Sequence, residues 1–93
     1  MTDGKILERL QAWYQSQCNE TWEHSYGVEI GTLDNPGWTL KVDLAGTTFE
    51  KRDLQEFAFR GEDRNDWYTC RKENSQFLAF GGPQELAVMI EFF

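Results

Sequence analysis

Residues 26–44 fit few backbone arrangements other than a β-hairpin. Apolar or β-branched side chains alternate with polar or small ones on both sides of Asp34-Asn35-Pro36-Gly37, and this alternation is typical of strands with one buried face. Proline fixes φ and glycine tolerates unusual φ values, so the tetrapeptide suits a chain reversal. The alternating set comprises Tyr26, Val28, Ile30 and Thr32 before the turn, and Trp38, Leu40, Val42 and Leu44 after it.

The register of this hairpin, that is, which residues of the two strands lie opposite each other, can be predicted if its apolar side chains share one face. A two-residue loop would pair Glu29 with Leu44 and would place a carboxylate among apolar side chains. A loop of odd length avoids this, because side chains alternate with a period of two. We therefore predict the loop Asn35–Gly37, or a five-residue loop of the same register, with Ile30 opposite Val42 and the loop glycine at positive φ.

Two helices are predicted, one on each side of the strands. Residues 4–17 have the spacing of an amphipathic helix, with Thr2 or Asp3 as its cap. A second helix is expected to have Pro83 in its first turn, where proline is tolerated. The apolar faces comprise Ile6, Leu7, Leu10, Trp13 and Tyr14 in the first helix, and Leu86, Met89, Ile90 and Phe93 in the second.

Three further strands are predicted, at residues 54–60, 66–72 and 76–80, each next to a turn rich in Gly, Asn, Asp or Ser. Residues 45–53 predict a turn, a short strand and a turn, with Phe49 as the apolar anchor. Phe57 is expected to share a face with Phe59, since the two are separated by one residue.

These elements predict an α+β fold in a single domain over residues 1–93. A chain of 93 residues is of the usual size for one domain. Consecutive strands with short connections favour antiparallel pairing, because parallel pairs need long crossovers. We expect about five strands paired as a meander, with the N-terminal and C-terminal helices packed on its apolar face.

The charge of the chain favours a basic partner over a nucleic acid. Sixteen Asp and Glu against nine Lys and Arg give a formal net charge of −7, which repels phosphates and speeds encounters with a basic protein. Solubility is the alternative explanation for such a charge. The sequence has no apolar run of membrane-spanning length and no disulfide framework. We expect a cytoplasmic protein with reduced thiols, present as a monomer or weak homodimer.

Few residues have the spacing that catalysis or metal binding needs. Cys18, Glu23, His24 and Cys70 are the candidate ligands, but zinc sites use three or four Cys or His in close spacing, so we expect no metal and no cofactor. His24 and Ser25 are neighbours on a chain expected to be extended, so they would point to opposite faces. One enzymatic hypothesis remains, a small hydrolase or sulfur transferase that uses His24 with Cys70 or Glu23. The alternative for Cys70 is a small core residue of a strand.

The segment 19–24 and the hairpin fit a binding scaffold better than an active site. Trp22 and Tyr26 are expected to pack into the core, while Glu23 and His24 hydrogen-bond loop backbone or each other. A tryptophan after a Pro-Gly turn is either a packed strand residue or an exposed recognition anchor. We expect the charged loop near residue 62 and the segment 19–24 to meet a basic partner together. The candidate partner-binding residues are Glu20, Glu23, His24, Asp34, Trp38, Glu62, Asp63 and Asp66.

The run WEHSYGVEIGTLDNPGW at residues 22–38, with DWYTC at 66–70 and FGGP at 80–83, resembles the bacterial immunity protein 53 family. The resemblance covers nearly the whole chain and departs at Ala79-Phe80, where the family pattern has a glycine. It implies a non-enzymatic immunity protein that binds and neutralises the toxin of a polymorphic toxin system. The matching residues are Trp13, Tyr14, Gln17, Cys18, Trp22, Glu23, His24, Tyr26, Gly27, Thr32, Leu33, Asp34, Asn35, Pro36, Gly37, Trp38, Thr47, Asp66, Trp67, Cys70, Phe77, Gly81, Gly82 and Leu86.

Overall fold

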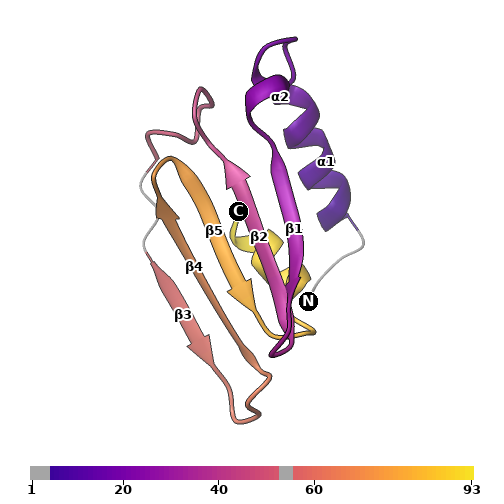
Figure 1. Cartoon of the computed structure of the whole chain (residues 1–93), viewed down its shortest axis with the longest axis vertical. Coiled ribbons are helices and arrows are strands. Elements are labelled where there is room, and N and C mark those ends of the chain that lie inside the picture. Colours follow the sequence, from indigo (N-terminus) through magenta and orange to yellow (C-terminus); the bar gives the residue numbers. More distant parts are fainter. Residues whose placement is uncertain (1–4, 53–55) are drawn as a thin grey trace.

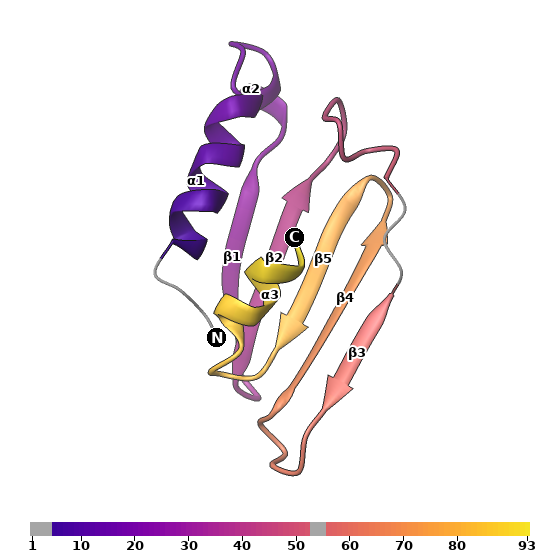
Figure 2. The ribbon, with the colours of Figure 1, turned by 180° about the vertical axis from the view of Figure 1, so that it is seen from behind.

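One antiparallel sheet with helices on a single face organises the chain (Figure 1, Figure 2). The computed structural model describes residues 5–52 and 56–93, so the predicted caps at Thr2 and Asp3 and the start of the strand predicted at residue 54 lie outside the described residues. The predicted α+β fold, with five antiparallel strands and two packed helices, is confirmed. The elements are α1 (Ile6–Gln17), α2 (Trp22–Ser25), β1 (Val28–Leu33), β2 (Gly37–Asp43), β3 (Phe57–Arg60), β4 (Trp67–Glu73), β5 (Gln76–Gly81) and α3 (Leu86–Phe92).

The order of the strands differs from a simple meander. It is β1-β2-β5-β4-β3, so β5 lies between β2 and β4, and β3 lies at an edge. The β1–β2 hairpin and the β3–β4–β5 meander join where β5 pairs with β2, for example with Leu40 opposite Ala79. The connection from β2 to β3 therefore crosses from the centre of the sheet to its edge. Residues 45–52 of this connection form turns and bends in place of the predicted short strand.

The β1–β2 hairpin has the predicted faces but a different register. Ile30 lies opposite Leu40 rather than Val42, and the loop between the strands is Asp34–Pro36. The predicted register is therefore wrong by two residues along one strand. Such a shift leaves every side chain on its face, because side-chain direction alternates with a period of two.

Gly37 is needed for space and not for an unusual backbone angle. Among the described glycines only Gly46 has a positive φ, so the predicted positive φ of Gly37 is wrong. A Cβ at Gly37 would lie 2.3 Å from the carbonyl oxygen of Gly81, which is closer than a carbon and an oxygen approach without a bond. The start of β2 can thus pack against the end of β5 only without a side chain there.

The core lies between the sheet and the two longer helices. The strands contribute fully buried side chains, and α3 contributes Met89, which is also fully buried. The buried face of α1 is narrower than predicted, since Leu7 and Tyr14 are exposed; α1 packs mainly against α3. The core cluster is Ile6, Leu10, Leu40, Val42, Leu44, Cys70, Phe77, Ala79, Met89 and Ile90.

Phe93 closes the core beyond the end of α3. The centroid of its ring lies 4.7 Å from that of Trp13 and 5.5 Å from those of Phe49 and Phe77. The predicted role of Phe49 as the anchor of its segment is confirmed by these contacts. Pro83 was predicted in the first turn of this helix. That prediction is wrong, because α3 begins only at Leu86 and Pro83 lies in the turn before it.

Candidate interaction surface

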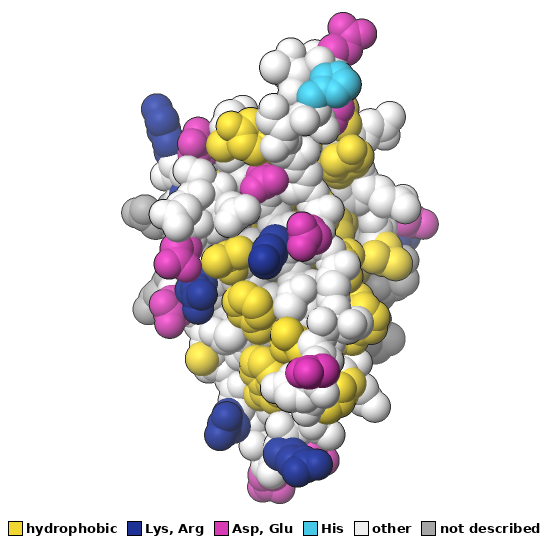
Figure 3. Space-filling model, in the orientation of Figure 1, with side chains coloured by type: hydrophobic (Ala, Val, Ile, Leu, Met, Phe, Trp, Pro, Cys, Tyr) yellow, Lys and Arg dark blue, Asp and Glu magenta, His cyan; other side chains and the backbone are white. Residues whose placement is uncertain are grey.

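No described element covers the face of the sheet opposite α1 and α3 (Figure 1). Hydrophobic side chains gather over the middle and lower part of this face, with charged side chains around them (Figure 3). The strand pairings place two neighbouring rows of side chains here. They are Gly31, Thr39, Phe80, Thr69 and Ala58, and Glu29, Lys41, Leu78 and Arg71.

Leu78, Phe80 and Trp67 form the apolar centre of the uncovered face. Phe80 and Trp67 are partly exposed. Leu78 is only 9% exposed, although no helix covers it, because Lys41 and Arg71 lie opposite it on its two neighbouring strands. The aliphatic stems of long cationic side chains cover apolar neighbours in this way while their charges stay in water.

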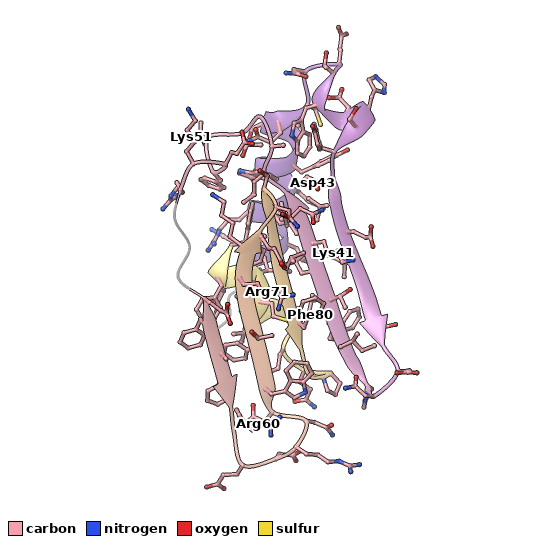
Figure 4. The ribbon with its side chains drawn as sticks, turned by 60° about the vertical axis from the view of Figure 1, so that its left-hand side comes forward. Lys41, Asp43, Lys51, Arg60, Arg71 and Phe80 are labelled. Carbon is pink, nitrogen blue, oxygen red and sulfur yellow. The ribbon has the colours of Figure 1, made fainter. Side chains whose placement is uncertain are left out.

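Polar contacts fix several side chains around this apolar centre. The Arg71 guanidinium lies 5.7 Å from the centroid of the Phe80 ring, and its Nε donates a hydrogen bond to Glu73 Oε2 at 3.2 Å. Asp43 accepts hydrogen bonds from Gln76 Nε2 at 2.8 Å and from the Gly27 N–H at 2.9 Å. Lys41, Asp43, Arg71 and Phe80 lie together on this side of the sheet (Figure 4). The surface is thus an apolar centre with a charged surround.

Carboxylates gather at one end of the sheet, in the loop from β3 to β4. Glu62 and Asp63 are exposed there, and Asp63 Oδ1 accepts a hydrogen bond from the Asn65 N–H at 2.8 Å. Burial, and then the hydrogen bond and charge of Asp66, raise the pKa of Glu85 above its ordinary value. The β1–β2 turn, which contains Asp34, lies at the same end of the sheet (Figure 1).

The segment 19–24 lies at the opposite end, where α2 stands beyond the strands (Figure 1). The structure therefore does not bring Glu20, Glu23 and His24 together with the loop at residue 62. Glu23 serves its own loop, as predicted, because its carboxylate accepts hydrogen bonds from the N–H groups of Asn19 and Glu20, both at 2.9 Å. Backbone hydrogen bonds, its own N–H first, lower the pKa of Glu23. The imidazole of His24 is exposed.

The tryptophans near the hairpin are structural. Trp22 is buried, as predicted, and its Nε1 donates to the carbonyl oxygen of Ala45 at 2.9 Å. Trp38 is the packed strand residue and not the exposed anchor, because it packs against the core and its Nε1 donates to the Pro83 carbonyl oxygen at 2.9 Å. Tyr26 was predicted to be buried and is 43% exposed.

The arrangement of His24 and Cys70 argues against the enzymatic hypothesis. Cys70 is 0% exposed in the middle of β4, opposite Phe57 and Ala79. Burial raises the pKa of its thiol to about 11, and a protonated thiol is a poor nucleophile. His24 belongs to the helical turn α2, which the sequence had indicated as extended chain.

Four hollows of the described surface are small and lie away from these residues. Their volumes are from ≈ 100 to ≈ 330 Å³, below or close to the lower limit of about 300 Å³ for typical ligand sites. None of these four is lined by His24, Cys18 or Cys70. Both cysteines are free. Within residues 5–52 and 56–93, no group of three or more His, Cys, Asp or Glu is arranged to hold a metal ion.

Two features escaped the sequence interpretation. Lys72 lies on the helix side of β4, where its Nζ donates hydrogen bonds to the carbonyl oxygens of Phe49, at 3.3 Å, of Glu50, and of Arg52, at 2.6 Å. Its position two residues after Cys70 was the available signal, since a lysine on a buried face needs partners. The second is the apolar centre around Trp67 and Phe80, which occupy the faces of their strands opposite the core.

The fold and this surface together define a small α+β domain with one broad uncovered face. The immunity protein 53 model matches residues 7–93, and the chain therefore belongs to the immunity protein 53 family. No curated protein and no solved structure matches the sequence. In the part of the chain that the structure describes, no helix is both long and apolar enough to cross a membrane.

Proposed function

We propose that this immunity protein binds a cognate toxin domain and neutralises it by occlusion in the cell that produces the toxin. Membership of the immunity protein family, over residues 7–93, is the observation that carries the proposal. The uncovered face supports it, because an aromatic and apolar centre within a charged surround is the usual composition of a protein interface. A tight complex would bury roughly 1,200–2,000 Å² in total.

The proposed contact runs from Trp67 and Phe80 to the acidic end of the sheet. Asp34, Glu62, Asp63 and Asp66 are the residues of this end that we propose to face a basic toxin domain. Arg60 and Arg64 lie in the same region, so the local charge is mixed, but the net charge of the protein is −7. A negative field speeds association with a basic partner, most strongly at low salt.

The test measures association and dissociation rates with the toxin domain encoded beside this protein. Reversal of two charges, Glu62→Arg with Asp63→Arg, is expected to lower the association rate about tenfold at low salt and much less at high salt. The matched control is Glu8→Arg with Glu91→Arg, which changes the net charge equally from exposed helix positions. Trp67→Ala is expected to speed dissociation.

Each outcome bears on a separate part of the proposal. Equal association rates for the Glu62/Asp63 variant and the wild type at low salt would exclude the acidic end. Unchanged dissociation of Trp67→Ala would exclude the uncovered face. A neighbouring toxin domain that retains full activity beside an excess of the wild-type protein would exclude neutralisation itself.

A further inference from the structure

Strand β3 is an edge strand whose outer side no described element covers (Figure 2). Residues 56–60 are all exposed, with Phe57 and Phe59 at 42% and 39%. Exposed apolar edge strands pair readily with other chains, and proteins usually protect them with charges, prolines or covering segments. Residues 56–60, Glu-Phe-Ala-Phe-Arg, have a charge only at each end and no proline.

The exposed phenylalanines of β3 continue into a strip of rings on the helix side of the sheet, through the half-buried Tyr68. Phe57 lies 5.9 Å from Tyr68 and 5.0 Å from Phe92 between ring centroids, and Phe59 lies 5.1 Å from Tyr68. Phe92 itself is 37% exposed. The strip therefore ends at the free edge of the sheet, where a partner could extend it.

The hydrogen-bonding pattern shows which backbone groups of β3 point outward. The Gly61 N–H donates to the Asp66 carbonyl oxygen at 2.6 Å, and Arg60 lies opposite Trp67. Backbone groups of successive residues in an antiparallel pair point to opposite sides. The backbone groups of Phe57 and Phe59 therefore point towards β4, like the N–H of Gly61. The backbone groups of Glu56, Ala58 and Arg60 point away from the sheet.

We propose that β3 pairs antiparallel with β3 of a second copy of this chain, about a two-fold axis at Ala58. In this register Ala58 lies opposite Ala58, Phe57 opposite Phe59, and Glu56 opposite Arg60. The outward N–H and C=O groups of Glu56, Ala58 and Arg60 meet their counterparts, so every outward group in the segment gains a partner. The two aromatic strips become continuous on the helix side, and two Glu–Arg pairs form on the opposite face.

Charge and backbone direction together select this register. An axis at Glu56 or Arg60 would place two like charges opposite each other, which destabilises a strand pair. An axis at Phe57 or Phe59 would place one of the charged residues opposite Ala58. Only the axis at Ala58 pairs both charges of the segment with opposite charges. This pairing does not involve the toxin, so it is tested on the immunity protein alone.

The test is a charge-swap series measured by sedimentation velocity on the full chain, from micromolar to millimolar concentrations. The wild type is expected to dimerise reversibly. Arg60→Glu and Glu56→Arg, each of which creates two like-charge pairs per dimer, should each raise the dimer Kd about tenfold or more. The double variant Glu56→Arg/Arg60→Glu restores both pairs and should return the Kd to within a few-fold of the wild type.

Mixing the two single variants gives the sharpest outcome. In a mixed dimer one copy has arginine at both ends of the segment and the other has glutamate at both ends, so each cross-strand pair joins opposite charges. The mixture should therefore dimerise at concentrations where each variant alone does not. Arg64→Glu is the matched control, since it makes the same charge change in the adjacent loop and should leave the Kd unchanged.

Two results would overturn the proposal. One is a wild type that stays monomeric at millimolar concentration. The other is a double variant that dimerises no better than the single ones. Circular dichroism checks that each variant is folded, so that a loss of pairing is not mistaken for a loss of structure.

Discussion

At the scale of single residues, burial separates the two thiols of this chain. Cys70 is fully buried in the middle of the sheet. Cys18 is partly exposed, and its Sγ donates to the Tyr14 carbonyl oxygen at 3.4 Å. The raised pKa of Cys70, about 11, comes from the loss of water around the thiolate, the form in which a thiol reacts. Cys70 is thus a core residue in its chemistry as well as its packing.

Titration of Cys70 should reduce stability between pH 9 and pH 11. The ordinary thiol value of 9.0 applies to the unfolded chain, and the folded value is about 11. Below pH 9 the thiol of Cys70 is protonated in both states, and its contribution to the free energy of unfolding is complete. Above pH 9 the unfolded state releases the proton first, so stability falls until the pH passes the pKa of Cys70 in the folded state. From pH 8 to pH 11, the free energy of unfolding of the Cys18→Ala variant should fall by roughly 2 kcal/mol more than that of the double variant Cys18→Ala/Cys70→Ala. Urea unfolding at pH 8 and pH 11 measures this, and identical pH dependence would contradict it.

Single-residue roles were predictable from sequence where they depend on residue type and place in a strand alone. The interpretation of Cys70 as a small core residue of a strand rests on these, and its burial confirms it. The roles of Trp38 and Lys72 depend on partners distant in the sequence, the carbonyl oxygens of Pro83 and of residues 49–52. No local pattern contains those partners. The sequence therefore did not decide whether Trp38 is packed or exposed, and it gave no role to Lys72.

At the scale of elements, the residue that follows α3 helps to hold this helix on the sheet. The helix spans only Leu86–Phe92, and so short a helix has little stability without tertiary contacts. Phe93 supplies such contacts through its rings to Trp13, Phe49 and Phe77. Packing of Phe93 therefore connects α1, α3 and the turn at residue 49 in one cluster.

Loss of the Phe93 ring should destabilise the fold more than loss of its neighbour. Phe93→Ala is expected to lower the free energy of unfolding by about 3 kcal/mol, since it removes a ring from a packed cluster. Phe92→Ala is the matched control and should cost about 1 kcal/mol, because Phe92 is 37% exposed. Urea unfolding of both variants measures the difference, and equal losses would show that the cluster does not hold α3.

Element boundaries were predicted where a periodic pattern is long enough to define them. The faces of the β1–β2 hairpin were correct, but registers that differ by two residues along one strand bury the same side chains, so the pattern could not choose between them. The helical turn Trp22–Ser25 is shorter than two helical periods and left no periodicity to read. Its hydrogen bonds are made with the flanking loop: the Trp22 N–H donates to Asn19 Oδ1, and the Glu23 carboxylate accepts from the Glu20 N–H.

At the scale of the whole molecule, the sheet has a centre protected from solvent and two edges that are protected to different degrees. Strands β2, β5 and β4 have a neighbour on each side, whereas β1 and β3 each have one. Helix α3 lies over the central strands on one face, α1 runs beside the β1 edge, and β3 lies beyond both helices (Figure 2). Protection from solvent should therefore decrease from the centre towards β3.

Amide hydrogen exchange should follow this order. We expect the slowest exchange in β2 and β5, since their amides open only with global unfolding, and faster exchange in β1 and β3. Within β3, the amides of Phe57 and Phe59 should exchange more slowly than those of Ala58 and Arg60, which point outward, when the monomer is measured at low concentration. Exchange measured by NMR checks both expectations, and uniform protection across the five strands would contradict them.

The order of the strands in the sheet could not be predicted from the sequence, although their number and their antiparallel direction could. Alternation shows that Leu40 and Ala79 each belong to a strand with one buried face, but it does not show that they lie opposite each other. Short connections favoured neighbours in sequence as neighbours in space. The β2–β3 connection is long enough to escape that preference, and it carries the chain to the far edge of the sheet.

The pairing of β2 with β5 also has a consequence for synthesis. The two strands lie at residues 37–43 and 76–81, so a nascent chain on the ribosome holds the first hairpin long before its central neighbour emerges. Contacts between such distant residues form late and slowly. Until β5 leaves the exit tunnel, the apolar side of β2 has no lasting cover and is a surface that chaperones would recognise.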